Sequence, residues 1–212
     1  MSQNLVKTRP STGKRWKFWC MVTGGILVVT IFPIFTFVSL ALFPLPYSAI
    51  TNWLSDLGNS VYSPGGAIWY NTGCILTGVA LVPFFIGLNM FTLEEKWKKN
   101  VLVILQSFGL VQAFALVMIG VFSEDYPEQH ITWSSIFFVV NMLVQIIASI
   151  SLLHHPLFSK AIAAYGFATS AINVLFVVTL GESPAVEWMT VFTALGFVAL
   201  AVTNTIVKFR EK

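Results

Sequence analysis

Six long apolar segments, separated by short polar ones, dominate the pattern of residues along the chain. Each apolar segment contains about 20 residues or more, which is the length that an α-helix needs to cross the hydrocarbon of a bilayer. The helices predicted in this way cover residues 18–43, 66–91, 101–122, 133–153, 158–180 and 188–207. We therefore predict an all-α integral membrane bundle of six transmembrane helices, built as a single domain over residues 18–207. Residues 1–17 form a basic tail and residues 208–212 a second short tail.

The first connection, residues 44–63, has a pattern of its own. Ile50, Trp53, Leu54 and Leu57 recur at helical spacing, which predicts a short interfacial helix lying on the membrane after the first span. The same stretch holds Asp56, the only charged residue in residues 18–92. A lone carboxylate between two spans is a candidate functional group, and capping of a helix end is its structural alternative.

Composition supports a membrane protein. Charged residues make up 10% of the chain, whereas soluble domains carry roughly 25%. The net charge is only +3 and no basic patch lies outside the tails, so nucleic acid is not an expected partner. The two cysteines, Cys20 and Cys74, both lie in apolar segments and predict neither a disulfide framework nor a zinc site.

The distribution of charge predicts the orientation of the bundle. If the six segments alternate in direction, all 12 Lys and Arg residues fall on one side, and the positive-inside rule assigns that side and both termini to the cytoplasm. The membrane expected is the plasma membrane, or an endomembrane in a eukaryote. The opposite, outer side collects six acidic residues, which are Asp56, Glu124, Asp125, Glu128, Glu182 and Glu187. The tryptophans lie near both predicted boundaries, as an aromatic belt does.

The outer side is also where we expect a functional site. Asp56, Glu124, Asp125 and His130 all lie in or next to outer connections. Carboxylates with one imidazole can act as acid and base on a lipid headgroup, or hold a divalent cation. We favour a structural role, and we expect no cofactor, with a metal at these carboxylates as the less favoured alternative.

Two further patterns restrict the kinds of functional site that the chain can hold. A zinc site with three histidines is excluded by the predicted topology, because His154 and His155 fall at the cytoplasmic end of a helix whose outer end carries His130. Apart from Lys160, at the start of the fifth segment, no charged residue lies inside a predicted span, which weakens ion-coupled transport. Asn141, Gln145 and Gln112 are polar residues within spans; they indicate hydrogen bonds between helices, or a polar path through the bundle.

Two short motifs resemble a known group of proteins. The first comprises Pro46-Tyr47, then Ser55-Asp56-Leu57-Gly58, Pro64 and Asn71. The second comprises Gly120-Val121-Phe122, Glu124-Asp125 and His130. Together with the six-helix pattern over residues 18–207, they resemble the DRAM/Frag/Sfk-type six-helix membrane proteins and the related prokaryotic DUF 998 family. Two features depart from the pattern: the spacing from Tyr47 to Ser55 is longer, and Ser123 stands where the prokaryotic group often has proline.

The resemblance implies an integral membrane protein linked, in some eukaryotic members, to lipid handling. It marks a set of motif positions, namely Ser55, Asp56, Gly58, Asn71, Glu124, Asp125 and His130. No single reaction is implied for the family as a whole, so whether this protein is an enzyme stays open.

Three functions follow from these observations. The first is a protein that binds or organises membrane lipid, or a membrane protein partner, with an outer polar cluster centred on Asp56 and His130. In it Ser55, Gly58 and Asn71 serve as lipid-binding or structural motif positions. The second is an enzyme acting on lipid headgroups or acyl chains at the outer face, with Asp56, Glu124, Asp125 and His130 as catalytic residues. The third is a channel or small-solute transporter lined by Gln112, Asn141 and Gln145.

Overall fold

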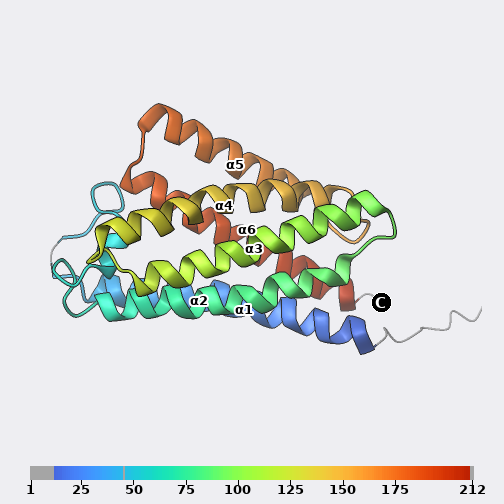
Figure 1. Ribbon diagram of the computed structural model, residues 1–212, viewed down its shortest axis with the longest axis horizontal. Helices are drawn as coiled ribbons and strands as arrows, with labels where there is room; N and C mark the ends of the chain where they lie inside the picture. Colours follow the sequence, from blue (N-terminus) through green and yellow to red (C-terminus); the bar gives the residue numbers. More distant parts are fainter. Residues whose placement is uncertain (1–11, 45, 211–212) are drawn as a thin grey trace, which may run out of the picture.

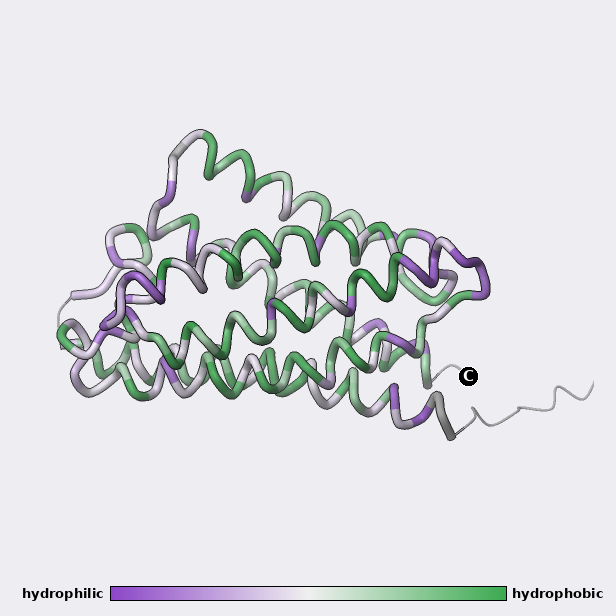
Figure 2. The backbone as a smooth tube through the Cα atoms, viewed as in Figure 1, coloured by the Kyte–Doolittle hydropathy of each residue, from purple (hydrophilic) through white to green (hydrophobic). Residues whose placement is uncertain are grey.

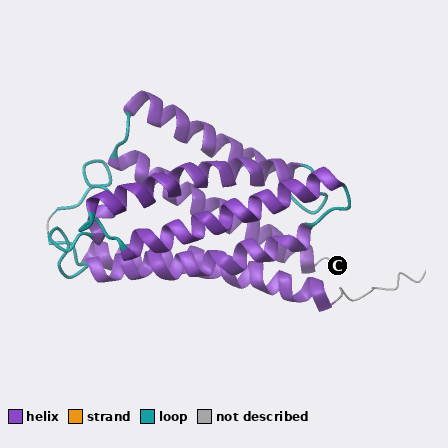
Figure 3. Ribbon diagram, in the orientation of Figure 1, coloured by secondary structure: helices purple, strands orange, loops and turns teal. Residues whose placement is uncertain are grey.

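The computed structural model describes residues 12–44 and 46–210, which form an elongated bundle of six long helices (Figure 1). In chain order the elements are α1 (Thr12–Ala41), η1 (Ser55–Gly58), α2 (Ala67–Gly87), η2 (Leu88–Phe91), α3 (Lys96–Val121), α4 (Pro127–Leu153), α5 (Lys160–Leu180) and α6 (Pro184–Arg210). Over these residues the chain is helix and loop, without strands (Figure 3). All six long helices are long and apolar enough to span a membrane. The predicted all-α bundle is confirmed, and the chain is that of a multi-pass membrane protein.

The two ends of the bundle differ in charge. The acidic end carries the connections 42–66, 122–126 and 181–183, and the basic end carries the start of α1, the connections 88–95 and 154–159, and the end of α6 (Figure 1). Polar residues gather at these ends, while the middle of the bundle is mostly apolar (Figure 2). His130 and His154 lie at opposite ends of α4, separated by about 36 Å of helix. The basic and acidic connections are therefore sorted to opposite ends, as the sequence predicts.

Four of the six long helices begin earlier than the apolar pattern suggests. α1 starts at Thr12 instead of residue 18, so part of the predicted tail 1–17 is helical, whereas residues 1–11 and 211–212 lie outside the described residues. α4 starts at Pro127 instead of residue 133, because proline fits the first helical turn, where its missing N–H costs nothing. A pattern of apolar residues does not include the polar first turn of a helix. This explains why α1 and α4 begin before the predicted segments.

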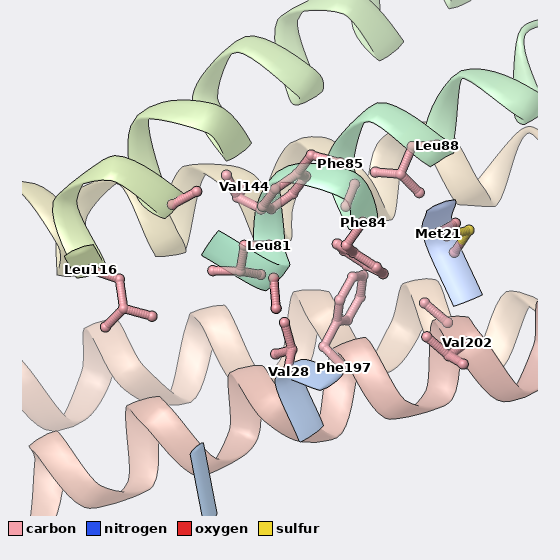
Figure 4. Packing of buried hydrophobic residues seen from close by; sticks show 14 of the residues in the cluster. Met21, Val28, Leu81, Phe84, Phe85, Leu88, Leu116, Val144, Phe197 and Val202 are labelled. Carbon is pink, nitrogen blue, oxygen red and sulfur yellow. The ribbon is translucent and has the colours of Figure 1, made fainter. Parts of the chain in front are cut away.

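Close approaches fix the packing of α1, α2 and α3. A Cβ at Gly87 would lie 2.3 Å from the Met21 backbone nitrogen, and one at Gly78 would lie 2.7 Å from the Ala113 carbonyl oxygen. Glycine at both positions lets the helix backbones touch, as is common between helices in lipid. Figure 4 shows apolar side chains of α1, α2, α3, α4 and α6, among them Phe84 and Phe197, directed into a shared interior.

α5 stands apart from this core. Its first half packs against the bundle, while most of residues 171–179 are exposed. Figure 1 shows α5 slanting away from α4 and α6 towards the acidic end. The interior is therefore enclosed by five helices, and α5 flanks it from outside.

Candidate functional site

The connection after α1 folds back over the acidic end of the bundle. We call residues 46–66 the cap loop. Its predicted interfacial helix is a single 3-10 turn, η1. Two apolar residues of the loop are buried, because Leu54 and Leu57 are 0% exposed, whereas Ile50 is 76% exposed. Ser39 of α1 donates a hydrogen bond to the Leu57 carbonyl at 3.1 Å. Burial of two leucines thus overrides the surface position that helical spacing alone suggests.

Asp56 is buried within this turn, with 8% of its surface exposed. Its Oδ2 accepts the backbone N–H of Trp53 at 2.9 Å, as an acidic side chain does when it reaches back to the start of a helical turn. Burial raises the pKa of the Asp56 carboxyl, although hydrogen bonds from Trp53, Asn52 and Glu124 partly offset this effect. The carboxylate that stands alone in the sequence therefore shapes the cap loop.

Glu124, in the α3–α4 connection, lies beside Asp56. Burial, followed by the negative charge of Asp56, raises the pKa of Glu124. Two neighbouring carboxyls do not both ionise readily, and a hydrogen bond joins the Glu124 and Asp56 side chains. This contact joins the two motif stretches that the sequence singles out.

Asp125 binds the outer part of the cap loop. Its Oδ1 accepts both the backbone N–H and the hydroxyl of Ser60 at 2.9 Å, and its Oδ2 accepts the Ser123 hydroxyl at 2.9 Å. Burial opposes ionisation, but these hydrogen bonds outweigh it and lower the pKa of Asp125. Asp125 is exposed, and its carboxylate joins the cap loop to the α3–α4 connection.

Asn71 and Gly58 meet at the base of the cap loop. The Asn71 side-chain nitrogen donates to the Gly58 carbonyl at 2.9 Å. A Cβ on residue 58 would lie 2.4 Å from Asn71 Oδ1 and 2.9 Å from a ring carbon of Tyr70. Glycine is needed here because α2 presses directly on the loop backbone.

Two residues of α6, neither in the predicted site, complete the attachment. Glu187 accepts the backbone N–H of Leu54 at 2.6 Å and that of Ser55. Trp188 donates from Nε1 to the Tyr47 hydroxyl at 3.2 Å, and Tyr47 donates to the Trp53 carbonyl at 2.5 Å. Burial raises the pKa of Tyr47 well above its usual value, so the hydroxyl keeps its proton.

Glu187 is the only acid of α6 and lies in its first turn, where the helix dipole favours an acid. This position in the first turn of a helix is the feature of the sequence that could have indicated the role of Glu187.

His130 lies apart from the Asp56–Glu124 pair. It is buried in the first turn of α4, and its Nδ1 lies 3.0 Å from the Phe122 carbonyl oxygen. That contact places the proton on Nδ1 and leaves Nε2 as an acceptor. Among the described residues the one ion pair joins Lys98 to Glu95, so His130 and Asp56 are not paired. His154, at the other end of α4, contacts the Ile150 carbonyl at the helix terminus.

An internal cavity begins beneath the cap loop and runs along the bundle. Polar groups of the acidic end that line it are Ser55, Tyr70, His130, Ser134 and Glu187. Its volume is about 90 Å³, several times the roughly 10–15 Å³ that one water molecule needs. Apolar side chains of α1, α2, α3, α4 and α6 form most of the wall, and Leu88, Leu152 and Phe158 line it near the basic end.

The predicted catalytic residues do not surround this space as one set. His130 and Ser55 line the cavity, whereas Asp56, Glu124 and Asp125 contact the backbone and side chains of the loops outside it. Within residues 12–44 and 46–210, no group of three or more His, Cys, Asp or Glu side chains is arranged to hold a metal ion. The geometry offers hydrogen-bond acceptors at the mouth of a largely apolar cavity.

Comparison of the chain with protein-family models, with curated proteins and with solved structures gives no match.

Proposed function

We propose that this protein binds an amphipathic lipid in the cavity, with the lipid headgroup beneath the cap loop and its chain along the bundle axis. The observation that carries the proposal is the continuity of one cavity from Ser55, His130 and Glu187 into apolar walls. Ligand sites are typically apolar with a few polar groups that orient the ligand. The volume and the enclosure by five helices favour a single acyl chain.

The polar mouth favours a headgroup that donates hydrogen bonds. The Glu187 carboxylate and the unprotonated Nε2 of His130 are both acceptors. A hydroxyl-bearing or amine-bearing headgroup donates to these acceptors, whereas a headgroup that carries only acceptors leaves them unmatched. The preferred class is a single-chain lipid with a neutral or cationic, donor-rich headgroup.

We place a lateral entry between α4 and α6. Several cavity-lining residues on these two helices are only partly buried, including Ser134, Phe138, Ala194 and Leu195. α5 diverges beside them (Figure 1). A lipid can therefore pass from the bilayer into the cavity without crossing the cap loop.

The surroundings of Asp56 support a structural role ahead of a catalytic one. Its carboxylate contacts the Trp53 N–H and not the cavity. Asparagine forms such backbone bonds about as well as aspartate, so Asp56→Asn should fold and bind lipid normally. Normal lipid binding together with loss of a lipid-modifying activity would instead support the enzyme alternative.

The orientation and the family belong to the same proposal. We place the basic end in the cytoplasm of a plasma membrane or endomembrane, following the positive-inside rule. We also retain the relation to the DRAM/Frag/Sfk-type and DUF 998 proteins. It is supported by the contacts that join the two motif stretches, Asp56 with Glu124 and Ser60 with Asp125.

The test is binding of N-stearoylethanolamine, a single-chain lipid with a neutral, donor-rich headgroup, to the purified protein. Ala194→Phe fills the cavity from α6, and Ala168→Phe adds the same bulk on the exposed face of α5. Saturable binding that Ala194→Phe weakens at least tenfold, and that Ala168→Phe leaves unchanged, is the expected result. Equal binding by the two variants, or no binding by the native protein, contradicts the proposal.

A further inference from the structure

Three carboxamide side chains line the same cavity deep within the bundle. Gln112 of α3 is 6% exposed, and Asn141 and Gln145 of α4 are each 2% exposed. All three line the cavity. Along α4, Asn141 lies eleven residues from His130, which corresponds to a depth of about 16 Å below the polar mouth. We call these three residues the amide triad.

The amide triad bonds within itself and to α5, but incompletely. Gln112 Nε2 donates to Asn141 Oδ1 at 2.9 Å, and Thr169 donates to Gln145 Oε1 at 2.8 Å. Gln112 Oε1, Asn141 Nδ2 and Gln145 Nε2 are buried without a partner. A buried polar group left unsatisfied is destabilising, so three such groups lining one cavity indicate a bound group.

The unpartnered atoms have a defined hydrogen-bonding pattern. They comprise one carbonyl oxygen and two amide nitrogens, that is, one acceptor and two donors. If oxygen and nitrogen are exchanged in both Gln112 and Asn141, that pair still leaves one acceptor and one donor free. The pattern at Gln112 and Asn141 therefore does not depend on how that pair is oriented, and at Gln145 it rests on the hydrogen bond that Thr169 donates to Oε1.

We infer that the amide triad is a second recognition point of the lipid site and binds a hydroxyl group carried partway along the ligand chain. A hydroxyl has one donor and two acceptor positions, the complement of the three free atoms. A ketone would satisfy the two nitrogens and leave Gln112 Oε1 unpaired, and a plain methylene chain would leave all three unpaired. The ligand class is thus a mid-chain hydroxylated lipid. This inference rests on the proposed function, because it needs a chain that enters from the acidic end.

The experiment compares N-stearoylethanolamine with N-(12-hydroxystearoyl)ethanolamine on the same preparation of purified protein. The native protein should bind the hydroxylated lipid roughly tenfold more tightly, as expected for one or two buried hydrogen bonds. In Asn141→Leu the ratio of the two affinities should fall to about one. Because the ratio is measured on one sample, it does not depend on the fraction of folded protein.

Asn173→Leu is the matched control. Asn173 is also a buried amide with an unpartnered oxygen, but it lies on α5 and does not line the cavity. This variant should keep the native preference. Equal affinities in the native protein, or an unchanged preference in Asn141→Leu, overturns the inference. If both lipids bind equally and Ala194→Phe weakens both, the lipid site stands and the hydroxyl recognition falls; if neither lipid binds, the proposed function itself fails.

Discussion

Glu187 accepts the backbone N–H of Leu54 at 2.6 Å, although the two residues are 133 positions apart. The bond fastens the cap loop, which follows the first helix, to the start of the last. Because Glu187 also lines the cavity, one carboxylate holds the cap loop in place and faces the ligand space. The cap loop and the cavity mouth are therefore parts of one structure.

Removal of that carboxylate should loosen the cap loop. Glu187→Ala leaves the Leu54 N–H without its partner, which should cost about 1–3 kcal/mol of stability. Thermal unfolding should occur at a lower temperature, and limited proteolysis should cut within residues 46–66. Glu182→Ala, at an exposed position in the connection before α6, is the control and should behave like the native protein. Equal melting temperatures for the two variants would contradict this attachment.

Substitution of Gly58 tests the packing beneath the cap loop. In Gly58→Ala the added methyl group would press on Asn71 and Tyr70, and such overpacking typically costs about 1–3 kcal/mol. Gly65 lies in the same loop, and a Cβ there meets no atom within 4 Å. Gly65→Ala should therefore melt close to the native protein while Gly58→Ala melts clearly lower. The reverse order would show that α2 does not press on residue 58.

The Asp56–Glu124 pair predicts how stability depends on pH. The folded pKa of both carboxyls is raised above their ordinary values of 3.8 and 4.5. Between those values and the folded pKa values the folded protein binds more protons than the unfolded chain, so stability falls as the pH rises through this window. Asp125, with its lowered pKa, acts oppositely, and its contribution is lost as the pH falls.

Glu124→Gln isolates the effect of the pair. The amide is neutral at every pH and can donate to Asp56 as the protonated acid does. Melting temperatures should match the native protein near about pH 5, and the variant should be the more stable one near about pH 8. The control is Glu128→Gln, at an exposed position of α4, which should keep the native profile. A native profile that stays flat across this range would contradict the raised pKa of the two carboxyls.

Orientation in the membrane can be read from labelling of single cysteines. A membrane-impermeant maleimide should label Glu182→Cys in intact cells, because this residue lies at the acidic end. Lys98→Cys, near the start of α3 at the basic end, should be labelled only after permeabilisation. The opposite pattern would invert the assigned topology.

The sequence predicts the six helices and the sorting of charge because both depend on local composition. It also selects Asp56, Gly58, Asn71, Glu124 and Asp125, which come together at the acidic end as the shared connections predict. What it misses depends on long-range packing. Leu54 and Leu57 are turned inward by contacts made above the bundle, and the role of Glu187 requires a partner 133 positions away. A cavity is a property of side chains from five helices and has no local pattern in the sequence.

The most direct test of the account is an experimental structure at high resolution of the protein in a lipid bilayer disc supplied with N-(12-hydroxystearoyl)ethanolamine. We predict elongated density in the cavity, with the headgroup beside Glu187 and His130 and the chain passing Asn141. A cavity that holds only water, or that has closed with the lipid confined to the outer surface of the helices, would contradict it.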